Sequence, residues 1–237
     1  MAKKKILLLA DDLRMHSGIA TMARTFVMGT LHHYDWAQIG GAIKHPEKGK
    51  VMDLNESVRK DTGVKDAYLK IYPVDGYGNQ ELLRQVINLE NPDAILHYTD
   101  PRFWEWLYQM EHEIRTQMPL FYYNIWDDLP YPMWNEPFYE SCDLIMNISK
   151  QTVNIVDNVC QTKPRTKTDN TYIPHGINEK NFYPINKDNK EWGSLLQFRR
   201  NIVAERDYDF IVFWNNRNIR RKLPGDVVMA FKTFCDM

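Results

Sequence analysis

Short apolar runs alternate with helical patterns along the first three quarters of the chain. The runs read as buried strands, and they cover residues 5–10, 36–43, 67–74, 94–97, 120–125, 143–148 and 171–173. Between several of them, apolar residues recur at helical spacing, in segments that begin near residues 18, 79, 100 and 149. Continuous apolar strands separated by amphipathic helices are typical of a parallel sheet with helices on both faces. We therefore predict an α/β fold built on a doubly wound parallel sheet.

The loop after the first predicted strand contains Ser17 and Gly18, where a helical pattern begins. A strand, a loop with glycine and a helix form a ligand-facing crevice at the C-terminal edge of a parallel sheet. The chain has no G-x-G-x-x-G here, so the dinucleotide fingerprint is absent. Two interpretations stay open: Gly18 lets the backbone approach a ligand closely, or the segment is an ordinary strand–helix turn.

A basic loop lies near the end of the chain, between an apolar run at 210–214 and a helical pattern that begins at Pro224. The run reads as a strand, and the loop contains Arg217 and Lys222. Main-chain N–H groups at a helix start attract anions, and arginine and lysine add donors for phosphate oxygens. This segment is either a diphosphate site or a solvated basic turn.

Two segments resemble motifs of glycosyltransferase family 4. NRNIRRK, residues 216–222, is similar to the family's donor-phosphate loop, although Asn216 stands where the family has glycine. YIPHGINEKNFYPI, residues 172–185, is similar to the family's interdomain segment. NPDAILHYTDP and CDLIMNISKQT also resemble family segments, and in the second one Ser149 is expected to cap a helix.

The resemblance implies the GT-B fold, with a Rossmann-like acceptor-side domain at residues 1–180. Residues 181–237 would be the linker and the incomplete start of a second Rossmann-like domain. The implied reaction transfers a sugar from a nucleoside-diphosphate sugar to an acceptor hydroxyl, with retention of configuration and without a metal or cofactor. The acceptor would be a carbohydrate, a lipid-linked molecule or a protein.

The resemblance also assigns roles to particular residues. It implies that Arg217 and Lys222 bind the donor diphosphate, and that Ser17 and Gly18 face the cleft. His175 and Gly176 would also lie at the cleft, although His175 stands where the family usually has asparagine, and a plain turn is the alternative.

Asp127 and Asp128 follow the predicted strand at 120–125 and so are expected on the crevice side of the sheet. Many family members carry a histidine near this point, which is missing here. Carboxylates can bind sugar hydroxyls or activate an acceptor hydroxyl as a base, so we assign both residues to the catalytic acceptor side. The alternative is that Asp127 caps a turn and Asp128 is solvated.

Composition narrows the functional classes. The net charge of −1 argues against a nucleic-acid binder, and no apolar run approaches the ~20 residues of a membrane span. The start of the chain lacks a signal-peptide pattern, and three cysteines without metal or redox spacing suit a reducing cytoplasm. Aromatic residues make up 13% of the chain, which suits either a packed core or carbohydrate-binding surfaces.

The segment after residue 190 is too short for a second doubly wound domain, since such domains take ~100–200 residues. We therefore expect a truncated or split protein, in which a second chain is one source of the missing half. The alternative function is a non-catalytic module of the same fold that binds a carbohydrate or a partner. A sugar-nucleotide epimerase would need an acid–base set that the sequence does not provide.

Overall fold

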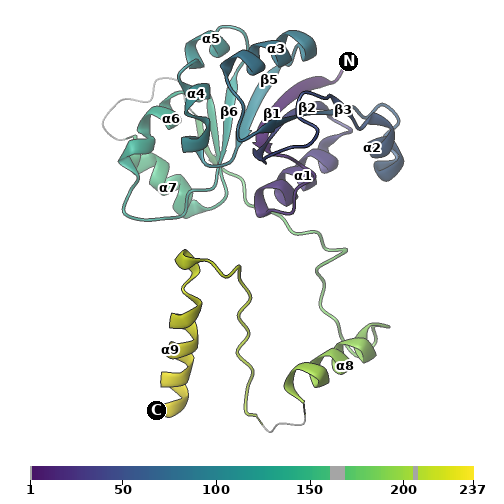
Figure 1. Cartoon of the computed structure of the whole chain (residues 1–237), viewed down its shortest axis with the longest axis vertical. Coiled ribbons are helices and arrows are strands. Elements are labelled where there is room, and N and C mark those ends of the chain that lie inside the picture. The colour runs from purple at the N-terminus through teal and green to yellow at the C-terminus, as the bar shows by residue number, and fades with distance from the viewer. Residues whose placement is uncertain (1, 161–168, 205–207) are drawn as a thin grey trace. The chain divides into compact units, whose positions relative to one another are not determined.

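The computed structural model of the chain describes residues 2–160, 169–204 and 208–237 (Figure 1). The chain divides into two compact units, Met1–Gly176 and Ile177–Met237.

The first unit is organised around one eight-stranded sheet with the order β3-β4-β2-β1-β5-β6-β7-β8. All neighbouring strands run parallel except β3, which is antiparallel to β4. The strands are β1 (Lys4–Asp11), β2 (Tyr34–Ile43), β3 (Met52–Asp53), β4 (Leu69–Asp75), β5 (Ala94–Tyr98), β6 (Leu120–Asn124), β7 (Leu144–Asn147) and β8 (Asp169–Tyr172). The sheet confirms the predicted α/β fold of this unit, a Rossmann-like arrangement of mostly parallel strands.

Helices cover both faces of the sheet, and each face has its own apolar core. One core holds side chains of α1 (Gly18–Thr30) and α2 (Asn55–Thr62). The other core holds side chains of five helices, which are α3 (Gln80–Glu90), α4 (Glu105–Tyr108), α5 (Glu111–Arg115), α6 (Glu136–Glu140) and α7 (Lys150–Val159). The central strands are buried on both sides, which explains why they read as continuous apolar runs.

The three longest helices of the first unit each begin at a residue whose side chain caps the helix, at the positions that the sequence pattern indicates. Ser17 accepts a hydrogen bond from the backbone N–H of Ala20 at 3.0 Å, and Ser149 accepts one from Thr152 at 3.0 Å. Asn79 caps α3 in the same way. The predicted cap at Ser149 is thus confirmed, and the Ser17 cap fixes the start of α1 at the C-terminal end of β1.

Strand order reverses between β1 and β5. The chain leaves β1 toward β2 and β4 on one side, and β5 through β8 follow on the other side. In open parallel sheets, ligands bind outside the carboxyl ends of the strands at such a switch point. The loops after β1 and β5 are therefore the first place to look for a site.

Two expectations about the first unit need correction. The sequence predicts one helix after residue 100, whereas the structure has a 3-10 helix (Pro101–Trp104) followed by the short helices α4 and α5. The short strand β3 and helix α2 were not predicted. Only Val58 of α2 is buried, so the helix leaves almost no apolar period in the sequence.

The second unit contains α8 (Trp192–Val203), a 3-10 helix (Arg220–Lys222) and α9 (Pro224–Asp236). The predicted strand at Phe210–Trp214 is wrong, because these residues form no ladder with any described strand. A strand needs hydrogen-bonded neighbours, and none is present among the described residues of this unit. The apolar side chains of residues 210–214 are exposed, and that of Phe213 is 82% accessible to solvent.

None of the described helices is long and apolar enough to cross a membrane.

Candidate functional site

Asp11 and Ser17 meet at the C-terminal end of β1. The Ser17 hydroxyl donates a hydrogen bond of 2.8 Å to Oδ2 of Asp11. Burial raises the pKa of the Asp11 carboxyl, and the bond from Ser17 offsets only part of that effect. Asp11 is thus a desolvated carboxyl beside the start of α1, at the switch point of the sheet.

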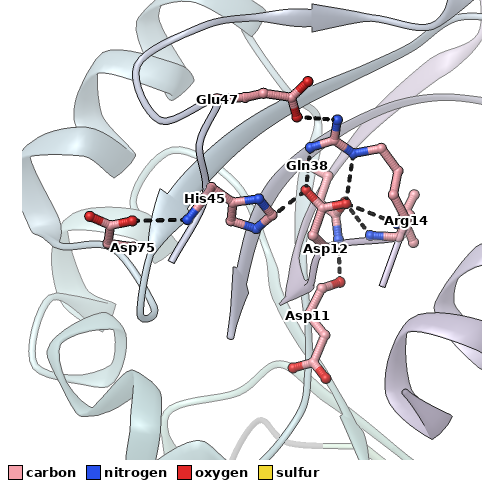
Figure 2. A network of polar contacts seen from close by, with 8 residues as sticks. Asp11, Asp12, Arg14, Gln38, His45, Glu47 and Asp75 are labelled. Carbon is pink, nitrogen blue, oxygen red and sulfur yellow. Dashed lines mark hydrogen bonds and ion pairs between the residues drawn. The ribbon is translucent and has the colours of Figure 1, made fainter. Parts of the chain in front are cut away.

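The next carboxylate, Asp12, belongs to a buried polar network (Figure 2). Burial would raise the pKa of Asp12, but the hydrogen bonds and charge of Arg14 hold it below its usual value. The Arg14 guanidinium also contacts Oε2 of Glu47 at 2.6 Å. Gln38 bridges the same loop, donating to the carbonyl of Asp11 at 2.8 Å and accepting from Leu13 N–H at 3.1 Å. These bonds hold the β1–α1 loop in one conformation.

The loop after β2 is tied to the same network. Nε2 of His45 lies 3.6 Å from Oδ2 of Asp12, and the His45 side chain is 6% exposed. Asp75, at the end of β4, accepts a hydrogen bond from the His45 backbone N–H at 3.1 Å and pairs with Lys48 at 2.9 Å. Three strand ends, those of β1, β2 and β4, are thereby joined by polar contacts.

Glycines at the end of β2 allow this close assembly. A Cβ on Gly41 would lie 2.6 Å from the carbonyl oxygen of Gly76, and one on Gly40 would lie 2.9 Å from Oδ2 of Asp12. Gly18 is different, since a Cβ there would meet no atom within 4 Å. Packing inside the protein therefore does not require glycine at position 18, whereas it does at positions 40 and 41.

Tyr98, at the end of β5, lies on the other side of the switch point. Its hydroxyl lies 3.3 Å from Nε2 of His175, and the His175 ring also contacts Tyr123, with centroids 5.5 Å apart. Burial lowers the pKa of His175. Burial raises the pKa of Tyr98, and the charges of Tyr123 and Asp11 raise it further. Tyr98 is the register partner of Ala10, the residue before Asp11, so the Asp11–Ser17 pair and the Tyr98–His175 pair lie at the C-terminal ends of two adjacent strands, β1 and β5.

Asp127 and Asp128 lie in the loop after β6, and both are exposed. Oδ1 of Asp128 accepts a hydrogen bond from the backbone N–H of Leu129 at 2.9 Å. The Asp127 side chain makes no hydrogen bond or ion pair with another described residue, whereas its carbonyl accepts a bond from Gln151. Asp128 thus bonds to the adjacent backbone N–H, whereas the Asp127 carboxylate has no partner among the described residues.

Arg217 and Lys222 lie in the second unit, at the N-terminal side of α9. Pro224 occupies the first turn of α9, and no side chain caps the helix start. Neither cation forms an ion pair with a described residue of its own unit, so both are free to meet an anion there. Gly176 ends the first unit, directly after His175.

A buried histidine, His97, was not singled out by the sequence. It is fully buried on β5, its Nδ1 lies 2.6 Å from the Tyr108 hydroxyl, and its ring stacks on Tyr122. Burial lowers the pKa of His97 to about 3, so the ring is neutral. Among the described residues, no group of three or more histidines, cysteines or carboxylates is placed to hold a metal ion.

The sequence also missed Asp11, Asp12 and Tyr98 as site residues. Their position was the available signal, because each stands at or directly after the C-terminal end of a central strand. Polar residues that follow buried strands at a switch point are candidates for that reason alone.

No protein-family model matches the chain. No curated protein matches it either. Among solved structures, the chain is similar to Anabaena Alr3699/HepE in complex with UDP and glucose, at 11% identity and a TM-score of 0.49, over 84% of this chain and 50% of that one.

Two further structures are similar, the second at a lower TM-score. The trehalose-6-phosphate structure from E. coli bound with UDP-2-fluoro glucose has 12% identity and a TM-score of 0.49, over 84% of this chain and 54% of that one. Medicago truncatula UGT71G1 complexed with UDP-glucose has 10% identity and a TM-score of 0.37, over 84% and 57%. The chain thus spans about half the length of each of these structures. Likeness at this level carries no argument about function, so the proposal below rests on the chain's own residues.

Proposed function

We propose that this chain is part of a glycosyltransferase that transfers a sugar from a nucleoside-diphosphate sugar to an acceptor hydroxyl. In this proposal the first unit is the acceptor-side domain, and the second unit carries the first donor-binding residues. The reaction would retain the anomeric configuration and need no metal.

The observation that carries the proposal is the convergence of Ser17 and His175 on one edge of the sheet. The two residues come from opposite ends of the first unit, and each belongs to a segment that resembles a cleft segment of family 4. Ser17 bonds to Asp11 and His175 lies against Tyr98, at the ends of the adjacent strands β1 and β5 on either side of the switch point, where parallel sheets bind ligands. Strand ends at such a place suit a sugar acceptor or the sugar end of a donor.

Donor binding is assigned to Arg217 and Lys222. Among the described residues neither cation has an ion-pair partner, and both precede an uncapped helix start, the arrangement that attracts a diphosphate. Fixed cations and helix dipoles can stabilise a leaving diphosphate without a metal.

The test is calorimetric titration of the full chain with UDP, GDP and ADP in the absence of added metal. We expect one nucleotide to bind, and Arg217→Ala or Lys222→Ala to weaken it roughly tenfold or more, the loss expected for charge-assisted bonds to phosphate. Arg200→Ala and Lys232→Ala are matched controls, because these cations lie on α8 and in α9 away from its start. Binding that persists unchanged in both site variants would refute the diphosphate assignment.

A second function remains as the alternative. A binding module of the same fold would bind a carbohydrate or a partner without turnover. Arg217 and Lys222 ahead of the start of α9 favour the transferase, because a donor diphosphate needs cationic groups at such a place. Transfer of radiolabelled sugar from the bound nucleotide's sugar conjugate separates the two functions.

A further inference from the structure

Aromatic rings, two half-buried and two exposed, line the C-terminal edge of the sheet beside the switch point. Tyr77 follows β4, Phe103 follows β5, and Trp126 and Trp134 follow β6. Together with Arg102 we call these residues the aromatic row. Phe103 is 53% exposed and Trp134 is 57% exposed, although both are large rings in the folded first unit.

Each ring in the row is held from one side. Tyr77 and Phe103 stack with their planes 3° apart and their centroids 4.9 Å apart. The Arg102 guanidinium lies over Trp126 at 5.1 Å, and Trp126 meets Trp134 edge to face at 6.1 Å. The row thus holds two contact groups, Tyr77 with Phe103 and Arg102 with Trp126 and Trp134, which are joined along the chain where Arg102 precedes Phe103. Each group has one exposed ring, Phe103 or Trp134.

The polar groups within the row are fixed as well. Asp100 accepts hydrogen bonds from the side chain and the backbone N–H of Arg102, which fixes the guanidinium plane. The indole N–H of Trp126 donates to the carbonyl of Asp128 at 3.2 Å, so this ring cannot rotate freely. Asp127 lies beside it with a free carboxylate. Rigid aromatic planes thus alternate with charged hydrogen-bonding groups.

We propose that the aromatic row is the binding surface for an oligosaccharide, which supplies the acceptor hydroxyl. A sugar ring has an apolar face of C–H groups surrounded by hydroxyls, which matches an aromatic plane flanked by a carboxylate or a guanidinium. Two exposed rings separated by a charged segment fit successive sugar units better than a single sugar.

A protein partner is the main competing occupant, since tryptophan and arginine are common at protein interfaces. The place of the row favours the glycan. It lies at the strand ends, beside the loops of the proposed cleft, and Asp127 offers hydroxyl contacts at its end. The row's role as an acceptor site rests on the proposed transferase function, whereas glycan binding by the row does not.

The test is binding of the full chain, without nucleotide, to an array of immobilised neutral and acidic oligosaccharides, followed by titration with the best-bound glycan. We expect Phe103→Ala and Trp134→Ala each to weaken binding roughly three- to tenfold, and Trp134→Phe to keep most of it. Tyr34→Ala is the control, because Tyr34 is an exposed ring at the opposite edge of the sheet. Urea midpoints verify that the variants fold.

Absence of binding to every oligosaccharide on the array overturns the proposal, and so does binding that survives the double variant Phe103→Ala/Trp134→Ala. Because the assay contains no nucleotide, its outcome is independent of the Arg217 titration. If the chain bound a glycan but no nucleotide, the assignment of the aromatic row would stand and the transferase function would be refuted.

Discussion

Asp11 and Asp12 are neighbours in sequence, yet the pKa values of their carboxyl groups are shifted in opposite directions. Their side chains point to opposite sides of the end of β1, as successive residues of a strand do (Figure 2). Asp12 meets the Arg14 guanidinium, whereas Asp11 has only the Ser17 hydroxyl. One end of a strand thus presents a stabilised carboxylate and a desolvated one.

Replacing these two residues should change stability in opposite directions at pH 7. The pKa of Asp11 is raised in the folded protein, so its protonated carboxyl favours folding. This contribution to stability is complete below pH 3.8 and is lost as the pH rises through the folded pKa. Asp11→Asn should therefore raise the free energy of unfolding by up to about 1 kcal/mol. Asp12→Asn should lower it by about 1–3 kcal/mol, because Arg14 loses one of its two carboxylate partners and keeps only Glu47 among the described residues. Urea unfolding measures both, and a loss of stability in both variants would contradict the assignment.

His97 should remain neutral across the acid range. Its pKa is near 3 in the folded protein and 6.5 for the free side chain, so the unfolded state binds more protons between those values. Stability should fall as pH drops through this window, by at most about 1.4 kcal/mol per pH unit from this residue. Imidazole NMR signals of His97 that titrate near pH 6 would disprove the buried, neutral state.

Glu90 is a buried carboxylate whose loss should be costly. It accepts hydrogen bonds from Lys5 at 2.8 Å, from Tyr68 at 2.7 Å and from Tyr72 at 2.6 Å. Burial would raise the pKa of Glu90, but these bonds hold it below its usual value of 4.5. Its stabilisation is therefore present above pH 4.5 and is lost as pH falls through the lower folded value.

Glu90→Gln should lower the free energy of unfolding by about 1–3 kcal/mol at pH 7 and flatten the acid dependence below pH 4.5. Glu113→Gln is the matched control, because Glu113 pairs with Arg84 on the surface, where solvent screens the pair, so this substitution should cost much less than Glu90→Gln. Equal effects of the two substitutions in urea unfolding at several pH values would show that burial of Glu90 is unimportant.

Two glycines should respond to alanine in opposite ways. Gly41→Ala places a methyl group against the backbone of Gly76, so we expect a loss of about 2–4 kcal/mol. Gly29 lies in α1 with open space around its Cα, so Gly29→Ala should stabilise the helix by about 0.5–1 kcal/mol. Thermal unfolding of the two variants measures both effects. If Gly41→Ala is tolerated, the close approach of Gly41 to Gly76 at the end of β2 is ruled out.

Local pattern was enough to predict the sheet, because central parallel strands are apolar on both faces. The predicted cap at Ser149 follows from local chemistry too. The contact of Tyr98 with His175 joins residues 77 positions apart, so no local pattern contains it. The Asp11–Ser17 bond needed the end of β1 to be known to the residue, and boundaries are the least reliable part of such predictions.

The wrongly predicted strand at Phe210–Trp214 shows where a local pattern is not enough. Its apolar run satisfies every local criterion for a buried strand, but strand formation depends on neighbours elsewhere in a sheet. The described residues of the second unit supply helices and no second strand. The apolar pattern therefore indicates the strand propensity of this segment, but it does not determine the structure that the segment adopts.

The short strand β3 leaves part of the sheet's margin uncovered. It pairs only with Lys70 and Ile71 of β4, so the following residues of β4, up to Asp75, have no strand on their outer side among the described residues. Such a margin invites pairing with another molecule. Pro73 removes one donor there, and Lys48 holds its charge against Asp75. Charge and proline at this margin should discourage self-association of the protein in concentrated solution.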